Sequence, residues 1–425
     1  MLAAMPPTPP TPPDRGETRI RDRGDACPGA LRLHTADDGG LARLRVPAGV
    51  LTARQVDVLA ASAEALGDGA LSITSRGNVE LRGLGEGCGA ELAALLRKTG
   101  LLPSDSHERV RNVVASPLAG LDGLGCADVQ LWARELDELL CASDWAAGLS
   151  GRFLFALDDG RGDVAGLGAD VTLLAEPGGA AVLRVGPQAF RVRTADAPRA
   201  ALAAAEAFLA AANAAGTGAW RVRELPAGRD VALGAYLEAA GVAAELFPFG
   251  ARPALEDGHP AGPLPGVAQG AEGWALSVGA PLGRLTVRQV RALLPAPGGE
   301  VRLTPWRGVV VPGFADRDAA DARLAALTRA GFVTGPDSAW YGVGACTGRP
   351  GCAKSLSDVR ADAAPGGRGG GLPVYWSGCE RRCGHPHGAY VDVVATGGDR
   401  YEVNGSPVTR TALADAVTAA SRTRK

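Results

Sequence analysis

The sequence predicts an α+β fold built by internal duplication, and three observations support this prediction. A strand–helix–strand pattern occurs twice, at 41–84 and at 274–314. Each copy is followed by a longer segment of mixed α/β pattern, and a stretch rich in Pro and Gly separates the two halves. The 425 residues are enough for two or three domains at about 150 residues per domain. We therefore expect two small half-domains, each paired with a larger α/β domain.

The two copies share the sequence that opens their helix. Thr52-Ala53-Arg54-Gln55-Val56 matches Thr286-Val287-Arg288-Gln289-Val290, and later Arg76-Gly77 matches Arg307-Gly308. Threonine directly before a helical pattern is a good N-cap, because its hydroxyl can accept a free backbone N–H of the first turn. Each copy is thus predicted to be an alternating strand, a turn marked by glycine, a helix and a second strand.

The larger segments show both helical and strand periodicity. The first is predicted to contain a helix at 127–140, strands near 152–157 and 171–174, and an alanine-rich helix at 198–215. The second is predicted to contain a helix at 319–330, strands near 373–376 and 390–395, and a helix at 409–422. The expected divisions are a disordered proline-rich tail 1–26, a half-domain 27–101, an α/β domain 102–246, a linker 247–272, a half-domain 273–315 and an α/β domain 316–425.

Composition limits the class of protein. The net charge of −2 gives no electrostatic argument for a nucleic-acid or polybasic membrane surface, and 46% apolar residues allow a sizeable core. No run of about 18 apolar residues occurs, and the first five residues are too short for an export signal. We expect a cytoplasmic protein without a nucleic-acid or membrane partner. Thiols stay reduced in that compartment, so clustered cysteines indicate metal or redox chemistry.

Four of the eight cysteines lie close together near the C-terminus, as Cys346-x5-Cys352 and Cys379-x3-Cys383, with glycines around them. Thiolates converging from glycine-rich loops are typical of a [4Fe–4S] cluster. Zinc is an alternative, although structural zinc sites usually pair cysteines two to four residues apart, and unliganded thiols are another. The other cysteines are weaker signals. We expect buried, small apolar roles for Cys88, Cys126 and Cys141, and keep Cys27 as a possible site residue.

This cysteine pattern behind a duplicated unit resembles the sirohaem nitrite and sulfite reductase superfamily. Ser75-Arg76-Gly77-Asn78 and Arg111-Asn112-Val113 are similar to its two arginine motifs. The resemblance implies a pseudo-two-fold duplicated fold with two ferredoxin-like half-domains and two larger α/β domains. It also implies that Cys346, Cys352, Cys379 and Cys383 hold a [4Fe–4S] cluster and that Arg76 and Arg111 bind tetrapyrrole carboxylates. In a sirohaem enzyme, Cys383 would bridge the cluster to the haem iron.

The chain departs from the reductases where they carry a Lys-x-Lys pair. Arg152 would replace one of these lysines, but Leu154 stands in the place of the second. With Cys27-Pro28-Gly29 and Thr304-Pro305-Trp306-Arg307-Gly308, this looks more like the precorrin-3B synthase branch of the superfamily. That branch implies oxygen-dependent hydroxylation of precorrin-3A with lactone formation, and a non-haem iron beside the cluster in place of sirohaem. The alternatives are a sirohaem-dependent assimilatory nitrite or sulfite reductase and a non-enzymatic cluster protein.

A precorrin carries many carboxylates, and the planar guanidinium of arginine pairs both carboxylate oxygens. The resemblance makes Arg76, Arg111, Arg152 and Arg307 the expected ligands of these carboxylates. Further cations near the cysteines, each equally compatible with a solvated surface role, are Arg349, Arg381, Arg382 and Lys354.

The remaining ligands and partners are less well specified. His385-Pro386-His387 could reach a non-haem iron or serve as an ordinary loop histidine pair, and no catalytic residue is assigned. No nucleotide-binding fingerprint occurs, so reducing equivalents are expected from a separate donor, a ferredoxin or an NAD(P)H-dependent reductase. The expected substrates are a precorrin tetrapyrrole and O2.

Overall fold

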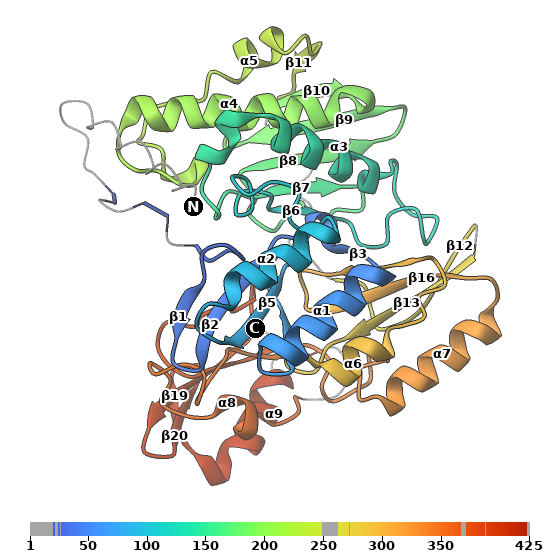
Figure 1. Ribbon diagram of the computed structural model, residues 1–425, viewed down its shortest axis with the longest axis vertical. Helices are drawn as coiled ribbons and strands as arrows, with labels where there is room; N and C mark the ends of the chain where they lie inside the picture. Colours follow the sequence, from blue (N-terminus) through green and yellow to red (C-terminus); the bar gives the residue numbers. More distant parts are fainter. Residues whose placement is uncertain are drawn as a thin grey trace. The chain divides into compact units, whose positions relative to one another are not determined.

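The computed structural model describes residues 20–21, 24–25, 27–248, 262–271, 273–366, 371–386 and 388–422. The chain forms two compact units, which are described separately (Figure 1). Unit 1 comprises Met1–Cys27, Ser104–Ser116 and Gly125–Asp257, and unit 2 comprises Pro28–Pro103, Pro117–Leu124 and Gly258–Lys425. Most of the predicted tail 1–26 and more than half of the predicted linker 247–272 lie outside the described residues. The linker prediction is wrong for Gly266–Gly270, which form a strand. No helix in the described ranges is long and apolar enough to span a membrane.

Unit 2 contains both predicted half-domains, each with a five-stranded antiparallel sheet. The first sheet has the order β1 (His34–Ala36), β2 (Gly39–Leu44), β5 (Val79–Leu84), β4 (Ala70–Ile73) and β14 (Arg284–Thr286). The second has the order β12 (Gly266–Gly270), β13 (Gly273–Gly279), β16 (Gly308–Phe314), β15 (Glu300–Leu303) and β3 (Val50–Thr52). The accompanying helices are α1 (Ala53–Leu66), α2 (Cys88–Lys98), α6 (Val287–Ala292) and α7 (Arg317–Arg329).

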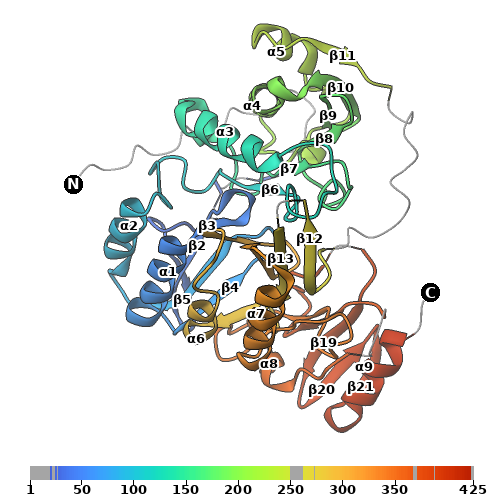
Figure 2. The ribbon, with the colours of Figure 1, turned by 90° about the vertical axis from the view of Figure 1, so that its right-hand side faces the viewer.

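The two half-domains exchange a strand, so each completes the other's sheet. Strand β3 of the first repeat pairs with β15 of the second, and β14 of the second repeat pairs with β4 of the first. Helices α1 and α6, which follow the exchanged strands, pack against each other (Figure 2). Buried residues of both repeats, such as Leu59, Leu81, Val301 and Val309, belong to one core. The predicted duplication is therefore confirmed, and its two copies fold together.

The exchange brings the two backbones very close at Gly49. This residue has φ 73°, and a Cβ atom on it would lie 1.9 Å from the carbonyl oxygen of Leu303. Both the left-handed backbone and the lack of space require glycine here.

Both helices of the repeat begin with the same capping box. The Thr52 hydroxyl accepts the N–H of Gln55 (3.2 Å) and the Gln55 side chain accepts the N–H of Thr52 (2.9 Å). Thr286 and Gln289 make the same pair of bonds at 3.3 and 3.0 Å. The two N-caps predicted from the repeat are confirmed.

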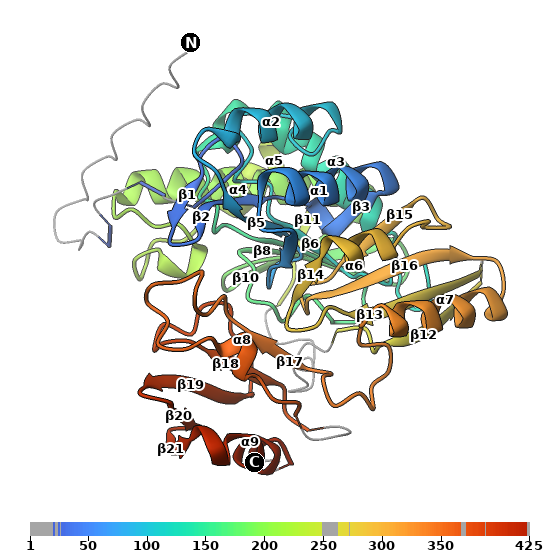
Figure 3. The ribbon, with the colours of Figure 1, turned by 60° about the horizontal axis from the view of Figure 1, so that its bottom comes forward.

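The remainder of unit 2 is an α/β domain around one mixed sheet (Figure 3). Its strands run in sequence order, with the first three parallel and the last two antiparallel. The strands are β17 (Val343–Ala345), β18 (Val374–Ser377), β19 (Val391–Gly397), β20 (Arg400–Val403) and β21 (Ser406–Thr409), with helices α8 (Val359–Asp362) and α9 (Leu413–Arg422). Trp376 and Tyr401 meet edge to face in its buried core.

Unit 1 repeats this topology. Its sheet also begins with three parallel strands and continues antiparallel. The elements are β6 (Val113–Ala115), β7 (Phe155–Asp158), β8 (Val171–Glu176), β9 (Ala180–Val185), β10 (Gln188–Arg193) and β11 (Ala244–Leu246), with helices α3 (Val129–Ala142), α4 (Ala197–Ala215) and α5 (Leu233–Ala239). Helix α4 follows β10 as α9 follows β21. Every helix and strand predicted for the larger segments is present, but the helix predicted at 319–330 in the domain 316–425 is α7, which packs on the sheet of the second half-domain. The largest shift is at 409–412, which ends β21 and forms a 3-10 turn.

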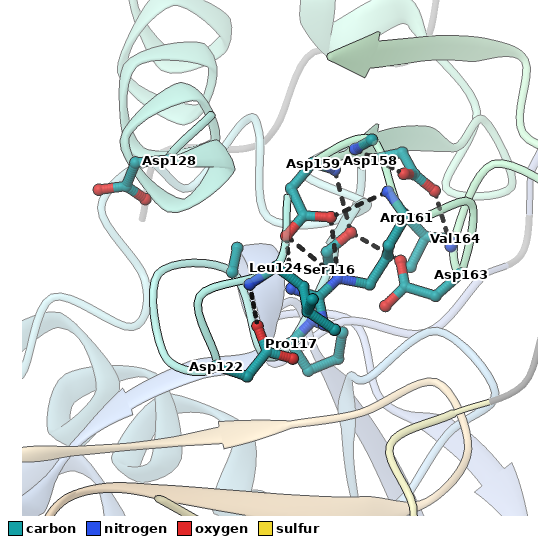
Figure 4. A network of polar contacts seen from close by, with 12 residues as sticks. Ser116, Pro117, Asp122, Leu124, Asp128, Asp158, Asp159, Arg161, Asp163 and Val164 are labelled. Atoms are coloured by element: carbon teal, nitrogen blue, oxygen red, sulfur yellow. Dashed lines mark hydrogen bonds and ion pairs between the residues drawn. The ribbon is translucent and has the colours of Figure 1, made fainter. Parts of the chain in front are cut away.

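A network of buried carboxylates fills the loop after β7 in unit 1 (Figure 4). Asp158 accepts four backbone N–H groups of residues 160–165 at 2.8–3.1 Å. Asp159 pairs with Arg161 at 2.6 Å, and Asp163 accepts the hydroxyl of Ser116 at 2.6 Å. Burial raises the pKa of Asp163 to about 7, and the Asp158 carboxylate adds to the rise. Backbone N–H groups of the loop, Arg161 and Ser116 bind these carboxylates, so the network fixes the loop.

Replacing either capping threonine should weaken unit 2. Thr52→Ala and Thr286→Ala each remove a hydroxyl that satisfies a helix N-terminus, at a cost of about 1 kcal/mol each. Urea denaturation should show both losses. Thr35→Ala, on the exposed face of β1, should have a smaller effect. Equal effects for all three variants would contradict the capping role.

Asp163 should make stability depend on pH. Its pKa is raised in the folded chain, so between about pH 4 and pH 7 the folded state holds a proton that the unfolded state has lost. The free energy of unfolding should therefore fall as pH rises through this range and stay level above it. Asp163→Asn keeps an acceptor for Ser116 but does not titrate. Relative to this variant, the wild type should lose about 2 kcal/mol between pH 5 and pH 8 in urea denaturation. The exposed substitution Glu206→Gln should leave the wild-type pH dependence unchanged, and an unchanged dependence in Asp163→Asn would contradict the assignment.

Candidate functional site

The clustered cysteines lie at the carboxyl ends of two neighbouring parallel strands. Cys346 directly follows β17, and Cys379 comes two residues after β18. The register pairs Ala345 with Trp376, and the Cys346 N–H donates to the Trp376 carbonyl at 2.9 Å. Loops at this edge of adjacent parallel strands converge, which is why such edges commonly hold ligand sites. The pairing of β17 with β18 therefore brings the Cys346 and Cys379 loops close together.

Backbone bonds fix the loops that carry Cys352 and Cys379 and join them to each other. The Ser355 N–H donates to the Cys352 carbonyl at 3.0 Å, and the Leu356 N–H donates to the Gly378 carbonyl at 2.7 Å. On the second loop, the Arg382 N–H donates to the Cys379 carbonyl at 3.2 Å. These bonds place the Cys352 loop beside the Cys379 loop.

The four thiols lie close enough for their charges to act on one another. Burial raises the pKa of Cys346, which the N–H of Gly378, 3.2 Å from its sulfur, partly offsets. Burial also raises the pKa of Cys383, and the thiols of Cys379, Cys346 and Cys352 raise it further. Four thiolates could not coexist here without a strongly positive centre among them.

This donor set suits an iron–sulfur cluster in its chemistry. Four soft thiolates on glycine-rich loops are the ligands of [4Fe–4S] clusters, which span a larger volume than one ion. Among the side chains that the structure describes, no three Cys, His, Asp or Glu residues converge as the ligands of a single metal ion. The residues fit the cluster in type and neighbourhood, and ligation by these cysteines stays a prediction.

Gly378 allows the two loops to touch. A Cβ atom on this residue would lie 1.9 Å from the Ser355 hydroxyl oxygen and 2.8 Å from the Ser355 Cβ. Ser355 is itself fixed, because its hydroxyl donates to the Ser357 carbonyl at 2.7 Å. A side chain at 378 would therefore push the Cys352 loop away from the Cys379 loop.

Arg307 lies against the Cys383 loop. Its guanidinium donates to the Gly384 carbonyl and sits over the ring of Tyr375, 5.2 Å from the centroid. The Tyr375 hydroxyl donates to the Cys383 carbonyl at 2.7 Å. Arg307 thus reaches the cysteine site from the second half-domain.

Arg76 belongs to the matching turn of the first repeat. The two Arg-Gly turns are neighbours, because a Cβ atom on Gly77 would lie 3.2 Å from the Leu303 oxygen and 3.8 Å from the Pro305 nitrogen. The fold therefore brings together the turns that carry Arg76 and Arg307, the two arginines that the repeat matches. Their binding of tetrapyrrole carboxylates stays a prediction.

The two other predicted arginines lie in unit 1. Arg111 is buried and forms a bidentate ion pair with Asp137, with both contacts at 2.6 Å. Arg152 is exposed and lies over the Trp220 ring at 5.2 Å. Leu154, which stands where the reductases carry their second lysine, is an apolar side chain and is buried. The ion pair gives Arg111 a structural role beside its predicted one.

The four flanking cations divide into two kinds. Arg349 donates to the Ser355 carbonyl at 2.7 Å, and Arg382 pairs with Asp392 at 2.7 Å, so both fix their own loops. Lys354 and Arg381 are exposed.

The histidines give little support for an iron site. His385 is exposed, stacks on Tyr390 at 5.5 Å and has its Nδ1 2.9 Å from the Pro386 carbonyl oxygen. His387, the second member of the predicted pair, lies outside the described residues, as does His259. His107 is buried and joins Ser104, Ser106 and the Ser143 carbonyl.

The prediction that Cys88, Cys126 and Cys141 are buried is wrong. Cys126 is exposed, because it lies in the loop before α3, held by its N–H to the Asp159 carbonyl at 2.6 Å. Cys27, Cys88 and Cys141 are half-buried. Hydrophobic periodicity predicts burial only for residues of helices and strands, so it could not predict the exposure of Cys126 in a loop.

Two residues of the site were not found from the sequence. Tyr375 is buried on β18 and joins Arg307 to Cys383. Arg360 on α8 reaches the Ala345 carbonyl at 3.5 Å, directly before Cys346. Neither stands in a recognisable motif. The pairing of β17 with β18 brings Tyr375 to the cysteines, and the packing of α8 against the Cys346 loop brings Arg360 there.

Unit 1 has a counterpart of this site at the same point of its sheet. Ser116 follows β6 as Cys346 follows β17, and its N–H donates to the Leu157 carbonyl at 3.1 Å as that of Cys346 does to Trp376. The Asp159 N–H then donates to the Ser116 oxygen at 3.1 Å, as the Gly378 N–H does to the Cys346 sulfur. The carboxylate network of Figure 4 occupies the place that the cysteines hold in unit 2.

Comparisons with known proteins support the resemblance. Residues 34–98 match the family model described as the nitrite/sulfite reductase ferredoxin-like half domain. The chain is 28% identical to a precorrin-3B synthase of Sinorhizobium sp over 418 residues, covering 92% of this chain and 85% of the relative. It is 35% identical over 127 residues to a ferredoxin–nitrite reductase of Synechococcus elongatus, covering 28% of this chain and 25% of that enzyme. The structure of the Mycobacterium tuberculosis NirA protein matches with a TM-score of 0.69 at 17% identity, covering 88% and 79% of the two chains. The resemblance to the nitrite and sulfite reductase superfamily is confirmed, and the NirA match confirms the fold.

A side chain at Gly378 should impair iron binding. Gly378→Ala places a methyl group against Ser355 and should lower the iron and sulfide bound per chain after anaerobic reconstitution. Adding Ser355→Gly removes the obstructing atoms and should restore part of the loss. Gly335→Ala, where a Cβ atom meets nothing within 4 Å, is the matched control. Full iron loading of Gly378→Ala would contradict the importance of this contact.

Proposed function

We propose that this chain is a precorrin-3B synthase, which hydroxylates precorrin-3A with O2 and closes a lactone, using a [4Fe–4S] cluster. The observation that carries the proposal is the four-thiol site at the ends of β17 and β18, flanked by Arg307. The match to a precorrin-3B synthase runs through nearly the whole of both chains, whereas the match to the nitrite reductase covers about a quarter of that enzyme. The missing Lys-x-Lys pair, with Leu154 buried, points the same way.

The residues of the chain would bind and orient the substrate. Arg76 and Arg307 lie on neighbouring turns, and guanidinium groups suit the carboxylates on the rim of a macrocycle because each can pair both oxygens of a carboxylate. Gly384 uses one N–H donor of Arg307, and the remaining donors of the fork can pair with a carboxylate. Arg111 and Arg152 are proposed to serve the same purpose.

The cluster would supply electron transfer. Inserting one oxygen atom of O2 into the substrate leaves the other to be reduced to water, which takes two electrons and two protons. We propose that a separate ferredoxin or NAD(P)H-dependent reductase provides these electrons, and that the reaction takes place in the cytoplasm. A non-haem iron belongs to the proposal only as an expectation of the precorrin-3B synthase branch, because His385 is exposed and joined to its own loop.

A sirohaem-dependent nitrite or sulfite reductase is the second candidate. The specific observation in its favour is the 35% identity to a ferredoxin–nitrite reductase. In that case Cys383, the exposed cysteine of the four, would bridge the cluster to sirohaem.

Spectroscopy and product analysis should separate the two activities. Protein purified anaerobically should show broad thiolate-to-iron absorption and an EPR signal on reduction, without the sharp Soret band of sirohaem. With precorrin-3A, O2 and a reductant, the product should gain one oxygen atom by mass spectrometry, and the gained atom should be labelled when 18O2 is used. Cys352→Ser, which lacks one proposed ligand, is the control and should lose this turnover. A sirohaem band with nitrite or sulfite turnover would overturn the proposal and favour the second candidate.

A further inference from the structure

Arg360 is a half-buried cation that has no carboxylate partner among the described residues. It lies on α8, a single helical turn capped by Asp358, whose carboxylate accepts the Ala361 N–H at 3.1 Å. Among the described residues its guanidinium donates to two backbone carbonyls, that of Leu282 at 3.3 Å and that of Ala345 at 3.5 Å. Its Nε is buried and has no hydrogen-bond partner. Within the described ranges, no Asp or Glu forms an ion pair with it.

This environment disfavours the charge of Arg360 but does not remove it. Burial lowers the pKa of Arg360 to about 10, and the nearby cations Arg284 and Arg307 contribute to the decrease. Arg360 therefore remains protonated at neutral pH. A buried cation is costly unless an anion lies close to it. The fold accordingly leaves a requirement for negative charge at this point.

The acidic groups whose charges act on Arg360 are Tyr375 and Cys346. Burial raises the pKa of Tyr375 to about 12, so its hydroxyl is neutral at pH 7. Cys346 becomes an anion when its thiolate binds a metal. The guanidinium of Arg360 also lies near Cys346, because it donates to the carbonyl of Ala345, the residue directly before Cys346.

Helix α8 is fixed against the cysteine loop. A Cβ atom on Gly348, two residues after Cys346, would lie 2.9 Å from a methyl group of Val359, and the Arg349 N–H donates to the Ser357 carbonyl at 3.0 Å. Val359 is fully buried. Arg360 therefore has little freedom to swing towards solvent, and its position relative to the loop is set by packing.

We propose that Arg360 is the counter-cation of the Cys346 thiolate and raises the reduction potential of the cluster bound by the four cysteines. Reduction adds one negative charge to a site that already carries four thiolates. A fixed positive charge beside it stabilises the reduced form more than the oxidised form. Arg360 is a positioning and charge-compensating residue, not a catalytic one. The inference rests on the proposed cluster but not on the identity of the substrate.

The test compares full-length chains after anaerobic reconstitution: wild type, Arg360→Gln, Arg360→Lys and a control. Arg323→Gln is a matched control, because Arg323 is also a guanidinium whose pKa burial lowers, has a buried unpaired Nε, and donates to a backbone carbonyl, that of Pro295 at 3.2 Å. It lies on α7, outside the cysteine site. The readouts are iron and sulfide per chain and the midpoint potential of the cluster from an EPR-monitored redox titration.

Arg360→Gln should shift the midpoint to more negative potential, Arg360→Lys should return it towards the wild type, and Arg323→Gln should leave it unchanged. Loss of iron in Arg360→Gln that Arg360→Lys restores would also support the proposal. A wild-type midpoint in a fully loaded Arg360→Gln would overturn it, as would equal loss of iron in both Arg360 variants. A change only in substrate affinity would make Arg360 a substrate ligand and likewise overturn it. Failure of the proposed function looks different: a sirohaem band in the wild type refutes the synthase but leaves the comparison of potentials valid.

Discussion

The exchange of one strand between the two half-domains is the constraint on which unit 2 depends. Neither half-domain can complete its sheet alone, because β3 belongs to the sheet of the second repeat and β14 to that of the first. The exchange also fixes the two Arg-Gly turns as neighbours, since Gly77 lies against Leu303. The arginines of the candidate site are thus positioned by the same pairing that builds the core, and stability and function share one physical cause.

The duplication extends to the larger domains. The loops after β6 and β7 in unit 1 are equivalent to those after β17 and β18 in unit 2, but they carry carboxylates in place of thiols. Ser116 and Cys346 make the same backbone bond and accept the same N–H. In unit 1 the position is filled by hard carboxylates that bind the loop's own N–H groups, Arg161 and Ser116. In unit 2 it carries four soft thiols, whose charge as thiolates the proposed cluster would balance. The same backbone geometry therefore supports a closed structural network in one unit and an open ligand set in the other.

The near-neutral net charge gives no indication that arginines gather around the cysteines. A balance of 44 cations and 46 anions excludes a strongly basic surface but says nothing about where cations gather. Around the cysteines, Arg307 and Arg360 have no carboxylate partner among the described residues, whereas Arg382 has Asp392 and Arg111 in unit 1 has Asp137. Arginines without a carboxylate partner among the described residues therefore indicate the candidate site more specifically than the total number of arginines does.

The sequence by itself determined the duplication, the two threonine N-caps, the helices and strands with the clearest periodicity, and the cysteine pattern. Each of these depends on local spacing that periodicity and repetition record. It did not reveal that the repeats exchange strands, that Gly378 must admit Ser355, or that Arg360 and Tyr375 adjoin the cysteines. It also placed Cys126 in a core that this loop residue does not enter. These features follow from contacts between segments far apart in the chain, such as Ala345 with Trp376 and Arg307 with Gly384. Only the tertiary structure decides them, because strand pairing, not sequence spacing, sets which loops meet.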